Sequence, residues 1–466
     1  MKKSLPLILF PIMLVILTGV VYAQMGEQRT LWAVDRALAE GDPARAGDLL
    51  ASVAGQRPEF WEQAGMYALQ GGDSSKALAF LHNAQSADTL SGAGYLTLGD
   101  ILLEQADPTA ALSAWEKALA QNAPPLEVYR RTLAVHRAAN DFPAAIEDLR
   151  AILALTPDDA QAQYQLGLLL TTREPEASLA YLIQAADLDE TLADAVNLLE
   201  RSFRPSNETD DPAYTWVNVG RALASLGEWK LAGEAFAQAV AANPDYAEAW
   251  AFWGEAKGQV GEDGLVELDT ALNLNPASLT ANLLYALYQK RQGNYELALV
   301  YLHGADNLEP GNPSIQVEIG GTLHEMGNFN LALTYFQKAV LLAPREATYL
   351  HLLAQFCFQN NTQIEEVGLA AVRQALVLDD QDPVALDLMG YGYYLLNDMT
   401  LAERFLLQAL EITPESPRPW FHLGLVSLAM GDTQKAYEQL THAVALDPAS
   451  PVAEQAQRIL LQYFPQ

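Results

Sequence analysis

Apolar residues recur along this chain three and four positions apart, which is the spacing of one face of an α-helix. The segment WFHLGLVSLAMGDTQKAYEQLTHAVALDP, residues 420–448, shows this pattern twice, with a Gly-Asp pair between the two halves. The segment LDLMGYGYYLLNDMTLAERFLLQALEITP begins 34 residues earlier (420 − 386) and places the same kinds of residue at the same spacing. The chain is therefore predicted to repeat a unit of two helices joined by a turn.

The first helix of each unit combines an apolar pair with a glycine, as in Trp420, Leu423 and Gly424. The same arrangement returns at Trp250-Trp253-Gly254, Trp216-Val219-Gly220 and Tyr95-Leu98-Gly99. Glycine costs about 1 kcal/mol relative to alanine inside a helix. Its recurrence at one place predicts that a second helix crosses there too closely for a side chain.

The turn and the second helix have signatures of their own. The turns contain Gly72-Asp73, Asn140-Asp141, Gly227-Glu228, Gly293-Asn294, Gly327-Asn328, Asn397-Asp398 and Gly431-Asp432. Gly and Asn tolerate the left-handed conformation that ends a helix, and the neighbouring Asp or Asn can cap the next one. In the second helix a small, a large and a small residue stand four and three apart, as in Ala232, Phe236 and Ala239. This order lets two helices interdigitate.

Taken together, these positions make the chain resemble the tetratricopeptide repeat family. Repeats are predicted at 58–91, 92–125, 126–159, 160–192, 213–246, 247–278, 279–312, 313–346, 347–382, 383–416 and 417–450. The resemblance implies an all-α fold, an α-solenoid of stacked helix-turn-helix hairpins that forms a right-handed superhelix. One hairpin cannot bury its apolar face alone, so its neighbours complete the core.

The array is predicted to fall into two blocks. Residues 27–204 form an N-terminal block, 205–212 a polar linker, 213–450 a C-terminal block, and 451–464 a lone helix that caps the last repeat. The unit at 247–278 is shorter than its neighbours, in VGEDGLVE, and the unit at 347–382 is longer, in QNNTQIEEVG. The two blocks form either one continuous superhelix or two hinged ones, and the sequence leaves both open.

Residues 1–23 are expected to be a targeting segment. Lys2 and Lys3 precede an uncharged, mostly apolar run from Leu5 to Ala23, and Val21-Tyr22-Ala23 offers a site for signal peptidase. The run is also close to the length that spans a bilayer. It is therefore either a cleaved signal or a retained anchor, and the remainder of the chain is expected outside the cytoplasm.

The net charge and the cysteine content argue against some classes of function. The chain has 58 acidic and 27 basic residues, a formal net charge of -31, which argues against a nucleic-acid partner because such a surface repels phosphates. The single cysteine, Cys357, falls on an apolar helix face and is expected to be a buried hydrophobe.

Neither catalytic residues nor a cofactor or metal site is predicted. The seven histidines are scattered, His324-Glu325 lacks the second histidine of a zinc-protease motif, and no phosphate loop or nucleophile elbow occurs. The acidic stretches 208–211 and 379–382 lack the spacing of a calcium loop. An enzyme that uses groove carboxylates is the least favoured reading.

The resemblance implies that the first helices line a concave face, where a protein or peptide partner binds. In the N-terminal block these positions include Glu62, Asp100, Glu104, Arg130 and Arg137. In the last three repeats they include His351 and Gln355, and the expected partner-binding residues are Phe358, Tyr391, Tyr394, Phe421, Leu425 and Leu428. Exposed aromatic residues are typical binding anchors. The alternative, equally weighted, is that these side chains pack between neighbouring helices.

The function expected from the sequence is a non-enzymatic interaction scaffold, tethered through residues 5–23 or secreted. A narrower alternative is an accessory factor for envelope or polysaccharide assembly and secretion, which only analogy with the family supports. The sequence does not predict the oligomeric state.

Overall fold

The structure is a computed structural model, and it describes residues 27–204 and 211–464. The predicted signal or anchor at 1–23 and most of the predicted linker at 205–212 lie outside these residues. Among the described residues, none of the helices combines the length and the apolar character that crossing a bilayer requires. The chain divides into two compact units, one ending at Arg204 and the other beginning at Pro205, and each is described by itself.

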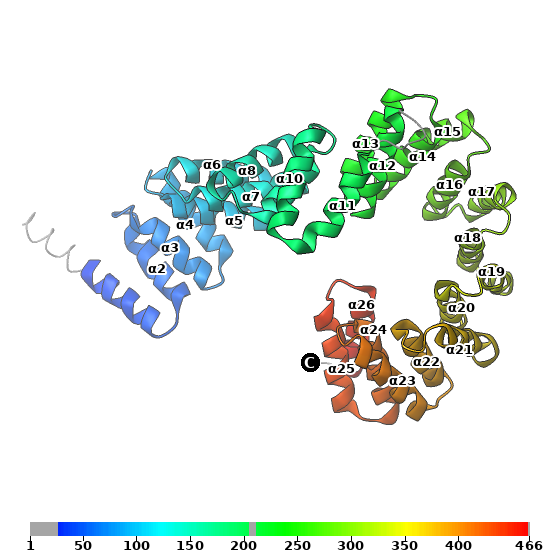
Figure 1. The fold of residues 1–466 in the computed structure, drawn as a ribbon. Helices are drawn as coiled ribbons and strands as arrows, with labels where there is room; N and C mark the ends of the chain where they lie inside the picture. The colour runs from blue at the N-terminus through cyan, green and yellow to red at the C-terminus, as the bar shows by residue number, and fades with distance from the viewer. Residues whose placement is uncertain (1–26, 205–210, 465–466) are drawn as a thin grey trace, which may run out of the picture. The chain divides into compact units, whose positions relative to one another are not determined.

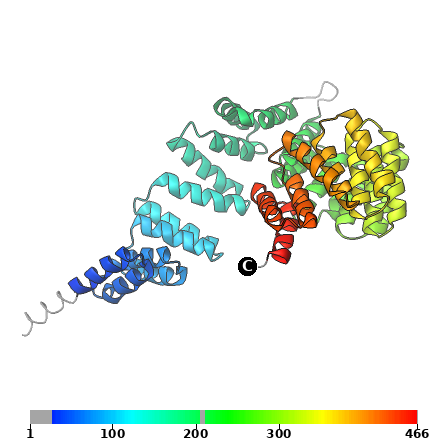
Figure 2. The ribbon, with the colours of Figure 1, turned by 90° about the horizontal axis from the view of Figure 1, so that it is seen from below.

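The first unit is a series of helical hairpins (Figure 1). Residues 27–39 are helical. They are followed by α2 (Pro43–Ala54), α3 (Phe60–Gln70), α4 (Ser74–Ser86), α5 (Gly92–Glu104), α6 (Pro108–Ala120), α7 (Pro125–Ala138), α8 (Phe142–Leu155), α9 (Ala160–Leu170), α10 (Pro175–Leu188), the short 3₁₀ helix η1 (Glu190–Leu192) and α11 (Ala193–Ser202). Figure 2 shows the helices of this unit lying side by side in successive antiparallel pairs.

The second unit continues the same alternation of first and second helices. It contains α12 (Pro212–Ser225), α13 (Trp229–Ala242), α14 (Ala247–Gln259), α15 (Leu265–Leu274), α16 (Leu279–Arg291), α17 (Tyr295–Leu308), α18 (Pro313–Glu325), α19 (Phe329–Leu342), α20 (Ala347–Gln359), the π-helix η2 (Ile364–Gly368), α21 (Leu369–Leu378), α22 (Pro383–Leu395), α23 (Met399–Ile412), α24 (Pro417–Met430), α25 (Thr433–Leu446) and α26 (Pro451–Tyr463). Every regular element in the described residues is helical, which confirms the predicted all-α solenoid of hairpins.

The helices cross at the predicted glycines. A Cβ atom added to Gly424 would lie 2.6 Å from Cγ of Leu440, which stands at the large position of the second helix. Gly220 and Gly99 face Phe236 and Trp115 with even less space. The close approach that the sequence predicted is therefore present, and a large residue of the partner helix fills the place that each glycine leaves open.

The predicted turns are also present, although their capping is more varied than predicted. Each predicted turn has its Gly or Asn at positive φ, for example 80° at Gly227 and 62° at Asn397. Asp398 and Asp432 cap the next helix through side-chain oxygens, but Asn294 and Asn328 do not. The amide of Asn294 instead donates a hydrogen bond of 2.8 Å to Oε1 of Gln289, so it is directed back to the preceding helix.

The two irregular units differ from the rest in their turns. In the long unit, Gln363 adopts φ 44° and is followed by η2, a wider helical turn that accommodates extra residues before α21. In the short unit, α15 begins directly after Gly264, where a Cβ atom would collide with the backbone of Gly254. The long unit contributes α20 to the lining of a pocket.

Candidate functional site

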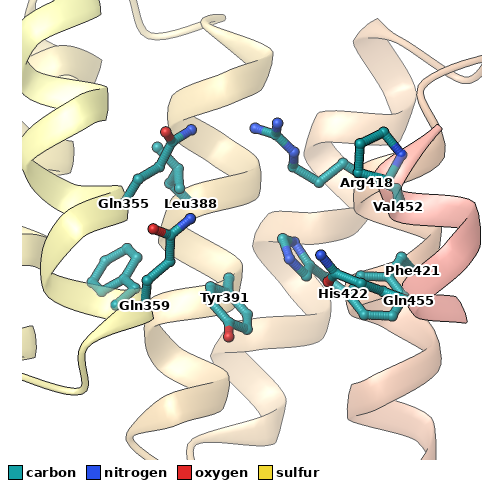
Figure 3. A pocket seen from close by; sticks show the side chains of 11 residues that line it. Gln355, Gln359, Leu388, Tyr391, Arg418, Phe421, His422, Val452 and Gln455 are labelled. Carbon is teal, nitrogen blue, oxygen red and sulfur yellow. The ribbon is translucent and has the colours of Figure 1, made fainter. Parts of the chain in front are cut away.

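A pocket of about 260 Å³ lies between the first helices of the last three repeats and α26. Helices α20, α22 and α24 each contribute side chains, and α26 follows α25 as the next first helix would (Figure 3). The lining residues are Gln355, Phe358, Gln359, Leu388, Tyr391, Arg418, Phe421, His422, Pro451, Val452 and Gln455. Four consecutive first-helix positions therefore share one concave site.

Phe358 forms a buried wall of this pocket and is only 2% exposed. Its ring occupies space left by two glycines outside the regular pattern. A Cβ atom on Gly368 would lie 2.5 Å from the ring, and one on Gly392 would lie 2.9 Å from it. The expectation that Phe358 is an exposed anchor is therefore wrong, because the longer turn of this repeat brings Gly368 and the ring together.

Tyr391 packs among other rings. Its ring stacks on that of His422 with centroids 4.3 Å apart and planes 11° apart, and it lies 6.0 Å from the ring of Tyr394. Burial raises the pKa of the Tyr391 hydroxyl, and Tyr394 and the carboxylate of Asp387 raise it further. Tyr391 is half-buried and lines the pocket as a neutral hydroxyl.

Beneath the pocket, carboxylates and imidazoles join neighbouring first helices. Nδ1 of His422 lies 2.7 Å from Oδ1 of Asp387, and both residues are buried. One helix earlier, Nε2 of His351 lies 2.8 Å from Oδ2 of Asp382, whose other oxygen caps α22. These pairs fix α20, α22 and α24 relative to one another and so shape the pocket.

The other expected anchors are also packed to different degrees. Phe421 is 7% exposed, so the expectation of an exposed ring is wrong for it as well. Leu425 and Leu428 are half-buried and pack with Phe421 against the apolar cluster that α26 completes. Tyr394 is half-buried, and burial, followed by the nearby Tyr463, raises its pKa. A role of these residues in contacting a partner stays a prediction.

In the first unit the expected concave residues link neighbouring helices. Glu62 accepts hydrogen bonds from the backbone nitrogen and the hydroxyl of Ser91 at 2.7 and 2.5 Å. Asp100 forms an ion pair of 2.8 Å with Arg131. Arg130 lies 3.2 Å from Asp159. Glu62, Asp100 and Arg130 thus each connect one first helix to the next first helix along the array.

Sequence reasoning missed the polar residues of the pocket, namely Gln359, Arg418 and Gln455. Gln455 lies on α26, which was expected only to cap the array, and the curvature that brings it near α20 is not visible in the sequence. The pairing of Asp387 with His422 could have been found, because the two residues stand on successive first helices, 35 positions apart, close to the 34-residue spacing of the units.

The lining of the pocket has side-chain amides, the guanidinium of Arg418, the phenol of Tyr391, the imidazole of His422 and apolar side chains, and it contains no serine, threonine or cysteine. In residues 27–204 and 211–464, no cluster of three or more His, Cys, Asp or Glu is arranged to hold a metal ion.

Comparison with known proteins identifies the repeats. Family models described as tetratricopeptide repeat match residues 135–193, 290–356 and 417–450. No curated protein matches the chain.

Several solved structures are similar to the chain at low identity. The APC/C hetero-tetramer Cut9–Hcn1 matches at 17% identity over 94% of this chain and 97% of that one, with a TM-score of 0.41. Yeast Tom70 matches at 16% identity over 80% of this chain and 88% of that one, with a TM-score of 0.41. A tetratricopeptide repeat protein from Parabacteroides merdae matches at 14% identity over 54% of this chain and 99% of that one, with a TM-score of 0.43.

The assignment rests on the matched repeats and on the hairpins, glycine crossings and left-handed turns described above. The chain belongs to the tetratricopeptide repeat family, whose stacked helical hairpins serve as scaffolds for protein–protein interaction.

Proposed function

We propose that this protein is a non-enzymatic scaffold that binds a peptide or protein partner in the concave pocket between α20, α22, α24 and α26. The observation that carries the proposal is the pocket itself, which four consecutive first-helix positions line. Its rim is polar, with Gln359, Arg418 and Gln455 exposed above the buried rings of Phe358 and Phe421. A buried apolar floor with a polar rim is the usual composition of a recognition site.

A binding role is also consistent with the groups that the pocket lacks. His422 is held by Asp387 through Nδ1, but no serine, threonine or cysteine lines the pocket beside it. The raised pKa of Tyr391 disfavours the phenolate that a catalytic base would need. These features support a scaffold over a hydrolase.

The scaffold lies outside the cytoplasm, held by residues 5–23 or released after cleavage near Ala23. The support is the sequence alone, in which two lysines precede a mostly apolar run. N-terminal sequencing of the protein from fractionated cells tests this location. Recovery of the uncleaved chain in the cytoplasmic fraction would contradict it.

The binding site is tested by filling the pocket. Gln359 is exposed at the rim, so Gln359→Trp would occupy the space above Tyr391 without disturbing the core. Gln434→Trp, an exposed change on the second helix α25, is the matched control. The full chain would be used to capture partners from envelope and secreted extracts. A partner retained by the wild type and by Gln434→Trp but lost by Gln359→Trp supports the proposal. Equal retention by all three proteins contradicts it.

A further inference from the structure

Arg418 is the one lysine or arginine among the residues that line the pocket. In the part of the chain that the structure describes, its side chain makes no ion pair or hydrogen bond. Lys435 pairs with Glu403 at 2.6 Å, whereas Arg373 and Arg404, like Arg418, form no ion pair among the described residues. Arg418 differs from Arg373 and Arg404 in its location, because it lines the pocket. Arg418 is exposed and points its guanidinium toward the pocket (Figure 3).

The pocket offers Arg418 no carboxylate of its own. None of the lining residues is Asp or Glu. Asp387 lines a neighbouring cavity together with Arg418, but its Oδ1 is engaged by His422, and it forms no ion pair with Arg418. The guanidinium is therefore available to a carboxylate supplied by a ligand, which it can hold through two parallel hydrogen bonds.

Three side-chain amides line the pocket together with this cation. Gln355 and Gln359 stand one helical turn apart on α20, and Gln455 reaches the pocket from α26 (Figure 3). None of these amides has a hydrogen-bond partner among the described residues. A side-chain amide both donates and accepts, so it complements the alternating N–H and C=O groups of an extended peptide backbone.

The pocket has a second cavity beside it, with a volume of about 350 Å³. Arg418 and Val452 line both spaces. A peptide whose carboxylate lies on Arg418 can thus continue in both directions. This arrangement favours an acidic side chain within a segment over the free carboxylate at the end of a chain.

We infer that the pocket takes an extended segment of a partner protein that carries an internal glutamate or aspartate. The carboxylate pairs with Arg418, and Gln355, Gln359 and Gln455 bond the backbone on either side. This inference rests on the proposed function and specifies the kind of partner it requires.

Selection from a random heptapeptide library displayed on phage tests the inference. The full chain would be compared with Arg418→Gln and with the control Arg373→Gln, which removes an exposed arginine from the second helix α21. Wild type and Arg373→Gln are expected to enrich peptides with an acidic residue at an internal position, and Arg418→Gln is expected to lose that enrichment. A selected peptide is then synthesised with Glu→Gln, or with its only carboxylate moved to the C-terminus. Either change is expected to weaken binding roughly tenfold or more, because Glu→Gln removes the charge that pairs with Arg418 and the C-terminal placement moves the carboxylate away from it.

Each other outcome contradicts a distinct claim. Peptides that lack acidic residues, or acidic peptides that bind Arg418→Gln equally well, would overturn the inference and leave the scaffold in place. If the peptide whose only carboxylate is at its C-terminus binds fully, the pocket recognises the end of a chain, and the inference of an internal acidic side chain is overturned. Selection of no peptide by any of the proteins would overturn the inference and contradict peptide binding by the proposed site.

Discussion

Nδ1 of His422 lies 2.7 Å from Oδ1 of Asp387, and this buried pair joins α24 to α22 directly beneath the pocket. The second oxygen of Asp387, Oδ2, is also buried and has no hydrogen-bond partner among the described residues. Burying a carboxylate carries a large desolvation cost, which its partner offsets only in part. The pair therefore fixes the relative position of two repeats more than it adds to their stability.

Removing one member of this pair is expected to destabilise the last repeats more than removing both members. Asp387→Leu leaves His422 without its partner and should cost about 1–3 kcal/mol in the last repeats. The double variant Asp387→Leu/His422→Leu should cost less, because no polar group is then left unpaired. Hydrogen exchange in α22 and α24 measures this locally, which a repeat array requires because its parts can unfold separately. Asp380→Leu, a substitution of an exposed residue, is the control. If Asp387→Leu destabilised the last repeats no more than Asp380→Leu does, the buried pair would not matter for their stability.

Gly→Ala substitutions are expected to destabilise the protein at glycines where two helices cross closely, and not at glycines that have space for a methyl group. A Cβ atom on Gly220 would meet the ring of Phe236, so Gly220→Ala is expected to destabilise α12 and α13 by about 1–3 kcal/mol. On Gly321, inside α18, the nearest atom to a Cβ is Nζ of Lys290 at 3.4 Å. Gly321→Ala is therefore expected to be neutral or to stabilise by up to about 1 kcal/mol. Urea denaturation followed by far-ultraviolet circular dichroism compares the two, and an order opposite to this would show that crossing distance does not set the cost.

The fold could be predicted because the residues that determine each hairpin lie within a single repeat. Gly220 and Phe236 stand at matched positions of two helices, and the left-handed turn at Gly227 lies between them, so local rules and packing agree. The site depended on features that one repeat does not contain. Phe358 matched the pattern of an exposed concave residue, but Gly368 and Gly392 leave room for its ring to turn inward. That room results from one irregular turn and from the contact between two repeats.

The ion pair between α14 and α16 is expected to stabilise the middle of the second unit. Nη1 and Nη2 of Arg291 donate hydrogen bonds to Oε1 and Oε2 of Glu255, at 3.0 and 2.6 Å, and Glu255 is 7% exposed. Arg291→Ala leaves this carboxylate buried without its cation and should cost about 1–3 kcal/mol, a range reduced for the partial exposure of the arginine. Arg345→Ala removes an exposed arginine and is the control. The two variants are compared by urea denaturation. If Arg291→Ala is as stable as Arg345→Ala, the ion pair orients α14 and α16 without adding to the free energy of unfolding.

The ionisation of Tyr285 is expected to make the stability of the protein depend on pH in the alkaline range. Its ring lies 4.3 Å from that of Tyr301, centroid to centroid, and is 7% exposed. Burial, followed by Asp269 and Tyr301, raises its pKa to about 12. An unfolded chain releases this proton near pH 10, at about the ordinary tyrosine pKa.

Between those two values the folded state holds a proton that the unfolded state has lost. The stabilising contribution of neutral Tyr285 is therefore complete below about pH 10 and is lost as the pH rises through about 12. Wild-type protein should lose stability between pH 9 and pH 11 more steeply than Tyr285→Phe, measured by urea denaturation at both values. Tyr437→Phe, which removes an exposed hydroxyl, should follow the wild type. Absorbance at 295 nm provides an independent measurement, because the tyrosinate signal that appears last in the native titration should be absent from Tyr285→Phe. Equal slopes for wild type and Tyr285→Phe would show that Tyr285 ionises at the same pH in the folded and unfolded chains.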